Sequence, residues 1–99
     1  MAKYIFSNKA IEDLSDIWNY TYNKWSENQA DKYYYLILES CEKISKNPKI
    51  GKKYETILHS LFGIKVVRHI IFYQILNENS ILILRILHEQ MDIKNRIKE

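Results

Sequence analysis

The sequence predicts an α+β fold: one strand, a two-helix antiparallel hairpin, and then a three-strand antiparallel meander that completes one small sheet. Two stretches with apolar residues at helical spacing follow one another with almost no loop between them, as in a helical hairpin. Apolar runs separated by short breaks then fill residues 62 to 88, as in a meander. The last run, residues 80 to 88 (SILILRILH), contains six Ile or Leu residues and is typical of a central strand.

Length and composition indicate a single folded domain spanning residues 1 to 99. Hydrophobic residues make up 46% of the chain, which is ample for a core, and two glycines and one proline leave little room for linkers. The longest apolar run is far short of the roughly 20 residues of a membrane span, and no signal peptide is expected. The single cysteine, Cys41, cannot form an internal disulfide, so we expect a cytoplasmic protein.

A cap and an apolar stripe predict the first helix. Residues 3 to 7 alternate as a short strand, and Ser7 or Asn8 can then cap a helix. Apolar residues recur at helical spacing over about four turns after this cap. We expect the whole stripe to lie in the core: Ala10, Leu14, Ile17, Trp18, Thr21 and Trp25.

The second helix begins at a capping box, in which the Ser26 hydroxyl accepts from the Gln29 backbone N–H while the Gln29 side chain reaches back. The helix runs from about residue 27 to residue 46, and Asn47-Pro48 ends it because the residue before a proline disfavours helical geometry. Its buried stripe consists of Ala30, Tyr33, Tyr34, Ile37, Leu38, Cys41 and Ile44. On this stripe Cys41 is a small core residue and not a nucleophile.

The second half of the chain predicts a loop followed by three strands. Residues 47 to 61 form a loop with one helical turn. The apolar run after it is too long for one strand, so it must break near Val67-Arg68. The predicted strands are residues 62 to 67, 69 to 76 and 80 to 88, with a polar turn at 77 to 79 between the last two.

One face of the predicted sheet has little to cover it. The helical hairpin covers one face, and only a short tail helix, capped by Asp92 and with Ile93 and Ile97 on one side, remains for the other. We expect function or a partner on this uncovered face. Residues 43 to 76 hold seven Lys or Arg and one acid, Glu55, which suits an anionic partner or makes a solvated basic face.

Polar residues on or beside the meander are candidates for function. Arg, Lys and His in a cleft can clamp phosphate, and a His or Tyr can act as acid or base in RNA cleavage. The candidate binding residues are Lys65, Arg68, His69, Tyr73, Arg85, His88 and Asp92. The alternative is structural: Arg85 pairs with Asp92 or with an early acid and holds the tail, the histidines are hydrogen-bonded, and Tyr73 packs with its hydroxyl at the rim.

The sequence carries no motif of a metal, cofactor or nucleophile site. The three histidines lack paired Cys or carboxylate residues at metal-ligand spacing. Two glycines do not make a phosphate-binding loop, and no strand-turn-helix nucleophile elbow is present. We therefore expect no metal, no cofactor and no catalytic residue.

Five segments carry a family resemblance that runs nearly from end to end. They are residues 5 to 21 (IFSNKAIEDLSDIWNYT), 25 to 34 (WSENQADKYY), 47 to 54 (NPKIGKKY), 62 to 73 (FGIKVVRHIIFY) and 85 to 92 (RILHEQMD). In this order and spacing the chain resembles the ParE toxins of the ParE/RelE superfamily of bacterial toxin–antitoxin modules. The last two segments are the specific ones, and the fold of that family agrees with the fold predicted above.

The resemblance implies a small cytoplasmic toxin that inhibits DNA gyrase, stabilises a plasmid, and is neutralised by an antitoxin encoded beside it. Family antitoxins wrap an extended and helical segment across the toxin, in complexes that can be of higher order. No membrane and no sequence-specific nucleic acid binding are implied. By the same resemblance Arg85, His88 and Asp92 correspond to the closing motif of the family, and His69 and Tyr73 to its third strand.

The nearest alternative is the RelE-type branch, which shares the fold and cleaves messenger RNA on the ribosome. Those enzymes resemble one another in carrying Arg or Lys on the sheet and a Tyr, His or Glu near the C-terminus. Here no Tyr or His follows His88, and the sheet lacks a dense basic cluster. The sequence therefore favours a toxin without catalytic activity, and a non-toxic binding module on the same fold is a third alternative.

Overall fold

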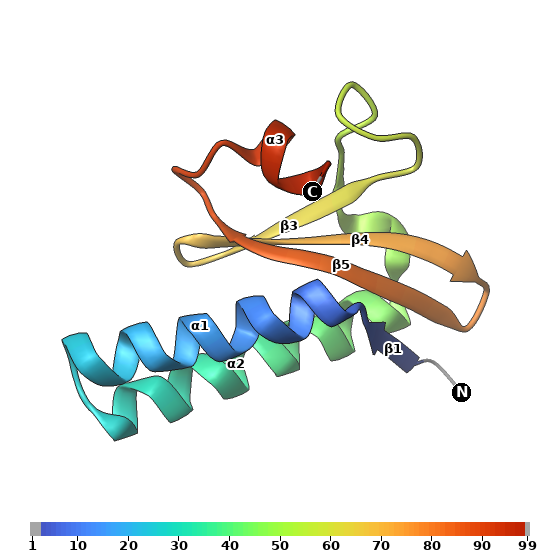
Figure 1. Cartoon of the computed structure of the whole chain (residues 1–99). Coiled ribbons are helices and arrows are strands. Elements are labelled where there is room, and N and C mark those ends of the chain that lie inside the picture. Colours follow the sequence, from blue (N-terminus) through green and yellow to red (C-terminus); the bar gives the residue numbers. More distant parts are fainter. Residues whose placement is uncertain (1–2, 99) are drawn as a thin grey trace.

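The computed structural model describes residues 3–98, which form a five-stranded sheet with two long helices on one face and a short helix on the other (Figure 1). The sheet order is β1-β5-β4-β3-β2, with β1 parallel to β5 and every other pair antiparallel. The elements are β1 (Lys3–Phe6), α1 (Asn8–Lys24), α2 (Glu27–Lys46), the 3-10 turn η1 (Pro48–Ile50), β2 (Lys52–Lys53), β3 (Phe62–Val66), β4 (His69–Asn77), β5 (Ser80–His88) and α3 (Ile93–Ile97).

The α+β prediction is confirmed, and so are the caps on which the two helices depend. The Ser7 hydroxyl accepts from the Ala10 backbone N–H at 3.0 Å, which fixes the start of α1. The Ser26 hydroxyl accepts from the Gln29 N–H at 3.1 Å, and α2 has the predicted bounds. These interactions span a few residues, which is why the sequence alone predicts them.

The meander has the predicted strands, but β3 ends one residue earlier, at Val66, and β4 runs one residue further, to Asn77 in the predicted turn. The break at Val67-Arg68 is confirmed, and Val67 has a φ of 57°, a left-handed conformation that is strained for a β-branched residue. The two-residue strand β2 was not predicted, because Lys52 and Lys53 carry no strand pattern and are ordered only by pairing with Gly63 and Phe62.

The expectation that the whole α1 stripe lies in the core is wrong at its end. Ala10, Leu14 and Ile17 are buried, whereas Trp18 and Thr21 are only half-buried outside the core clusters and Trp25 is 72% exposed. The helical hairpin extends past the β3–β4 turn, so its far end has no sheet to pack on (Figure 1). A large side chain at that end therefore stays in solvent.

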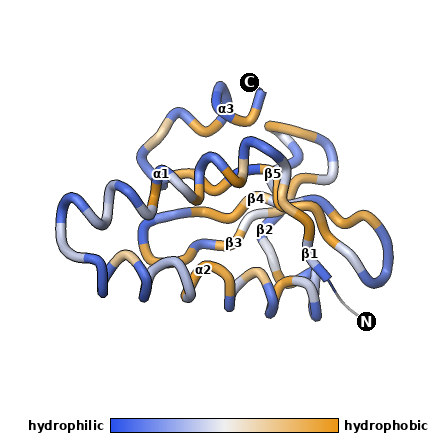
Figure 2. The backbone as a smooth tube through the Cα atoms, turned by 60° about the horizontal axis from the view of Figure 1, so that its bottom comes forward, coloured by the Kyte–Doolittle hydropathy of each residue, from blue (hydrophilic) through white to orange (hydrophobic). Residues whose placement is uncertain are grey.

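The expectation of an uncovered sheet face is also wrong. A second cluster of buried residues lies on the face opposite the helical hairpin and is covered by residues 54 to 61 together with α3 (Figure 2). A hydrogen bond from the Tyr54 N–H to the Leu61 carbonyl, 2.8 Å long, closes the covering loop. The cluster comprises Leu61, Ile70, Phe72 and Leu87, with Tyr54, Ile57, Leu84, Ile93 and Ile97 packed against it.

Tyr73 holds the loop after α2 onto the sheet. Its side chain is fully buried, so the expectation of a hydroxyl at the rim is wrong. The hydroxyl donates to the Pro48 carbonyl at 2.6 Å and accepts from the Gly51 N–H at 3.1 Å. Gly51 approaches so closely that a β-carbon there would lie 2.3 Å from this oxygen. Tyr73 is thus a buried structural residue.

We predict that Tyr73→Phe lowers the free energy of unfolding by about 1–2 kcal/mol, because the variant leaves two backbone groups without their partner. For a domain of this size the melting temperature should fall by several degrees, on the order of 4–8 °C per kcal/mol. Tyr35→Phe, at a tyrosine that is 65% exposed, is the matched control and should not change the melting temperature. Equal melting temperatures for the two variants would contradict this role of Tyr73.

Candidate functional site

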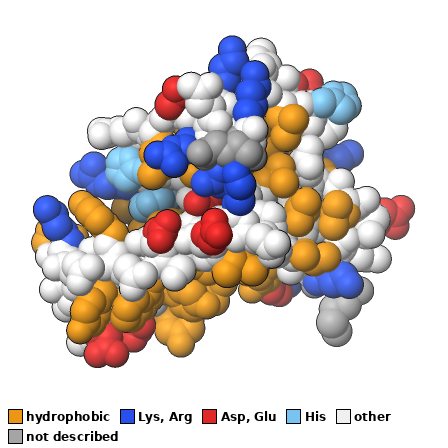
Figure 3. Space-filling model, viewed as in Figure 1, with side chains coloured by type: hydrophobic (Ala, Val, Ile, Leu, Met, Phe, Trp, Pro, Cys, Tyr) orange, Lys and Arg blue, Asp and Glu red, His pale blue; other side chains and the backbone are white. Residues whose placement is uncertain are grey.

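A groove of ≈ 1330 Å³ lies between the overhanging part of the helical hairpin and the end of the sheet (Figure 3). One wall is formed by α1 and α2, and the other by the β3–β4 turn, the end of β5 and the segment after it. Apolar side chains contribute to both walls, namely Ile17, Tyr20, Trp25, Leu36, Val67, Ile86 and Met91. The groove is therefore a mixed surface, with apolar groups set among charged ones.

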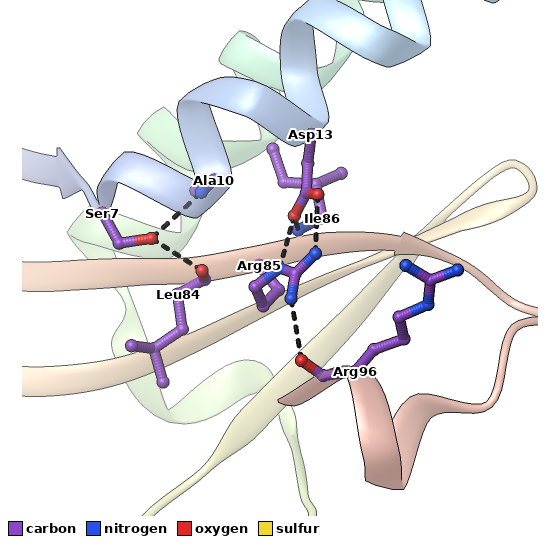
Figure 4. A network of polar contacts seen from close by, with 7 residues as sticks. All are labelled: Ser7, Ala10, Asp13, Leu84, Arg85, Ile86 and Arg96. Carbon is purple, nitrogen blue, oxygen red and sulfur yellow. Dashed lines mark hydrogen bonds and ion pairs between the residues drawn. The ribbon is translucent and has the colours of Figure 1, made fainter. Parts of the chain in front are cut away.

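Arg85 is the most tightly held polar residue of the groove wall. Its Nε donates to Asp13 Oδ2 at 2.8 Å and its Nη2 to Asp13 Oδ1 at 2.9 Å, a bidentate ion pair in which both side chains are 11% exposed. Its Nη1 donates to the backbone carbonyl of Arg96 in α3 at 2.7 Å. Arg85 thus joins β5, α1 and the tail (Figure 4).

The same carboxylate caps the edge of β5, where β1 no longer pairs with it. β1 is paired with β5 only as far as Ile83. Beyond that point the Ser7 hydroxyl hydrogen-bonds to the edge of β5, donating to the Leu84 carbonyl at 2.7 Å. Asp13 Oδ2 then accepts from the Ile86 N–H at 3.0 Å (Figure 4). The start of α1 therefore replaces a neighbouring strand.

A β-bulge brings Arg85 to this position. Phe72 pairs with Arg85 but Tyr73 pairs with Ile83, so β5 has one extra residue, Leu84, at this point. An extra residue inverts the alternation of side chains after it. As a result Ile83 and Ile86 both lie in the core beneath the helices, and Arg85 is placed between them beside the free edge.

His69, Tyr33 and His88 form a second polar cluster in the groove. Tyr33 Oη lies 2.6 Å from His69 Nδ1 and 3.0 Å from the Val66 carbonyl. Since the carbonyl can only accept, both contacts are satisfied when the phenol donates to Val66 and His69 Nδ1–H donates to the phenol oxygen. Burial, with a smaller contribution from His88, lowers the pKa of His69 to about 4. His69 is therefore neutral at pH 7.

His88 lies opposite His69 across the β4–β5 pair, with ring centroids 5.3 Å apart. Its Nδ1 accepts from the Gln90 N–H at 3.1 Å, which fixes the turn that leads into the tail. Glu89 pairs with Lys65 at 3.1 Å, and this hydrogen bond lowers the pKa of Glu89. These contacts agree with the structural alternative for the two histidines.

The structure brings four of the sequence-predicted residues together in the groove: Arg68, His69, Arg85 and His88. Lys65 lies beside them through its pair with Glu89. Tyr73 lies elsewhere in the core, and Asp92 caps α3 by accepting from the Asn95 N–H at 3.4 Å. Arg85 pairs with an early acid, Asp13, and not with Asp92.

Asp13 and Tyr33 are polar partners of the site that were not predicted by residue number. The only available signal was position, since Asp13 lies beside the apolar stripe of α1 and Tyr33 lies on that of α2, where the pattern predicts a core residue. The groups they contact are 72 and 36 residues away in the chain, beyond the reach of local pattern.

Other chemistry finds no support in the described part of the chain. Burial raises the pKa of the fully buried Cys41 thiol to about 12, so this residue is not a reactive thiol. Among residues 3–98 no group of three or more His, Cys, Asp or Glu side chains is placed to hold a metal ion. No described helix is both long and apolar enough to cross a membrane.

We predict that Asp13→Ala lowers the free energy of unfolding by about 3–5 kcal/mol, because Arg85 would remain buried without its counter-charge. Urea-induced unfolding measures this loss. Asp16→Ala, an exposed acid on the same helix, is the control and should change stability by no more than about 0.5 kcal/mol. The double variant Asp13→Ala/Arg85→Met should regain much of the lost free energy of unfolding, because it also removes the buried charge of Arg85. If Asp13→Ala changed stability as little as Asp16→Ala does, the role of the ion pair would be refuted.

We predict that His69 makes the protein less stable in acid. Its pKa is about 4 in the folded chain and roughly 6.5 in an unfolded chain, so between these values only the unfolded chain binds the proton. The stability that neutral His69 contributes is therefore complete above the pKa of the unfolded chain. It is lost as the pH falls toward the pKa of His69 in the folded chain. The urea midpoint of His69→Gln should therefore fall less steeply between about pH 7 and about pH 5 than that of the wild type.

The control for this pH effect is His59→Gln, at an exposed histidine in the loop, whose pH dependence should match that of the wild type. If the wild type and His69→Gln showed parallel curves, the lowered pKa of His69 would be excluded.

Comparison with known proteins supports the family resemblance of the sequence. The family model described as the ParE toxin of the type II toxin-antitoxin system parDE matches residues 4–93. Toxin ParE1 of Mycobacterium tuberculosis is 28% identical over 96 residues, which cover 97% of this chain and 98% of the relative. Toxin ParE1 of Caulobacter vibrioides is 29% identical over 94 residues, which cover 95% of this chain and 96% of the relative.

Solved structures show the same fold. A chain from the chromosomal ParDE system of P. aeruginosa superposes with a TM-score of 0.75 at 18% identity, covering 89% of this chain and 96% of that one. A chain of the toxin-antitoxin complex RelBE2 from Mycobacterium tuberculosis superposes with a TM-score of 0.68 at 20% identity, covering 89% and 98%. The family model extends over nearly the whole domain described above, and the chain therefore belongs to the ParE toxin family of type II toxin-antitoxin systems.

Proposed function

We propose that this chain inhibits DNA gyrase by binding it, without catalytic chemistry of its own, and that a cognate antitoxin neutralises it in the cytoplasm. Membership of the ParE toxin family supports the proposal. The observation that carries the choice of binding over catalysis is the state of Arg85. This guanidinium, which is buried in the groove wall, is occupied by Asp13 and by the Arg96 carbonyl.

The histidines give the same indication. RNA cleavage needs a general acid and a general base within reach of the scissile phosphate. His69 Nδ1 contacts the phenol of Tyr33, and His88 Nδ1 accepts from a backbone N–H. The pKa of His69, about 4, makes it a weak base and leaves it neutral at pH 7, without the imidazolium form that acts as a general acid. Neither residue is poised as the acid of such a reaction.

The groove supports an antitoxin as the neutralising partner. Its volume of ≈ 1330 Å³ and its apolar side chains suit an amphipathic segment of another protein. Two structures of the same fold are described as parts of toxin–antitoxin systems, which fits a partner of this kind. The overall charge of +3 favours an acidic antitoxin.

The test is a gyrase supercoiling assay on relaxed plasmid with the purified protein. We expect loss of ATP-dependent supercoiling and accumulation of linear, cleaved plasmid. A second arm replaces gyrase with topoisomerase IV, which distinguishes the two related targets. Full supercoiling in the presence of a protein shown to be folded would contradict the proposal, and cleavage of messenger RNA on ribosomes would then become the function to test.

A further inference from the structure

The helical hairpin has a second exposed flank, on the side of α1 opposite the groove. Ile11, Ser15, Trp18 and Tyr22 recur at spacings of four, three and four residues, so they form one line along α1. This line lies roughly 90° around the helix from the buried residues, and the groove-facing residues lie a similar angle the other way. We call the line, together with Tyr34 of α2, the outer hairpin face. Figure 3 shows apolar side chains gathered along this lower side of the helices.

The outer hairpin face is concave and contains exposed apolar groups. A cavity of ≈ 300 Å³ opens on it between the two helices, lined by Ile11, Leu14, Ser15, Trp18 and Tyr34. Ile11 is 54% exposed and Tyr22 is 49% exposed. A cavity of this size, with apolar walls and an apolar rim, can accept one large apolar side chain of a partner.

The aromatic residues of this face are held in place. Trp18 Nε1 donates to Asp31 Oδ1 at 3.0 Å, which fixes the indole to α2. The Tyr22 ring stacks on the indole with centroids 5.2 Å apart and an interplanar angle of 13°. Rigid Trp and Tyr side chains lose little conformational entropy on binding, and such residues dominate the energy of protein interfaces.

The charges around the face select the partner. The four residues of the α1 line carry no charge. The adjoining row on α2 holds three exposed acids, Glu27, Asp31 and Glu42, which are four and eleven residues apart in the sequence. The Lys46 ammonium lies 3.6 Å from the Glu42 carboxylate. This flank is therefore acidic on a chain whose net charge is +3. An acidic antitoxin that complements the rest of the chain would be repelled here.

We propose that the outer hairpin face docks the target enzyme, on a surface that presents a large apolar side chain flanked by Lys or Arg. This inference rests on the proposed function, which assigns the groove to the antitoxin and gyrase to the target. The two surfaces lie on opposite sides of α1. The target and the antitoxin therefore bind different side chains of one helix.

The experiment measures binding of the purified protein to DNA-bound gyrase by biolayer interferometry. Ile11→Lys and Tyr22→Lys each place a cation and remove an apolar group from an exposed position, so the fold should be kept. Each should weaken binding at least about tenfold. Ile50→Lys is the matched control, because Ile50 is 49% exposed but lies in η1, away from the face. The affinity of this variant for gyrase should equal that of the wild type.

The melting temperature of each variant shows whether it is folded. If Ile11→Lys or Tyr22→Lys does not fold, Ser15→Lys is used in its place, because Ser15 is an exposed residue of the same face. Wild-type affinity in the folded face variants would overturn the inference.

If the wild type itself does not bind gyrase, the proposed function fails and growth arrest on expression becomes the readout for the face. Arrest by the wild type and the Ile50→Lys control but not by the face variants would support the same surface for another target. Arrest by all of them would overturn the inference, and a wild type that neither binds gyrase nor arrests growth would overturn it together with the proposed function.

Discussion

The ion pair between Asp13 and Arg85 is the interaction on which the arrangement of this small domain depends. Strand β1 pairs with β5 only as far as Ile83, so the rest of that edge would expose unpaired backbone groups. Asp13 accepts from the Ile86 N–H there and holds Arg85, which in turn holds the carbonyl of Arg96 in the tail. A helix, a strand edge and the C-terminal segment are thus connected through one carboxylate. Because both charges are largely buried, removing either one leaves the other without compensation.

This use of charge explains why the groove suits binding better than catalysis. Catalysis of phosphate chemistry needs cations and acid–base groups that are free to meet a substrate. Here the guanidinium of Arg85 is part of the scaffold, and the ring of His69 is neutral and hydrogen-bonded to Tyr33. What remains on the walls is a mixture of apolar and solvated charged side chains, which can complement another protein surface.

Local features of this fold could be predicted from the sequence, and long-range ones could not. The capping box at Ser26, the helix over 27 to 46 and the strand over 80 to 88 depend on neighbours in the chain, so pattern predicts them. The pairing of Asp13 with Arg85 joins residues 72 positions apart. The sequence could suggest Asp92 or an early acid as the partner of Arg85, but it could not identify Asp13. The exposure of Trp25 and the covering of the second face by residues 54 to 61 depend on where the sheet ends, which no local pattern contains.

The overhang of the helical hairpin is what makes two separate binding surfaces available on so short a chain. Past Ile17 no residue of α1 is buried, and this end is held by the cap at Ser26, by the α1–α2 contacts and by the Trp18–Asp31 hydrogen bond. The overhang is therefore ordered without being covered. An ordered, uncovered helix presents both of its flanks: one faces the groove and carries charged side chains, and the other faces outward along a line of residues that carries none. Because both flanks belong to α1, a change that tilts this helix would alter both surfaces at once, whereas a change of one exposed side chain alters only its own.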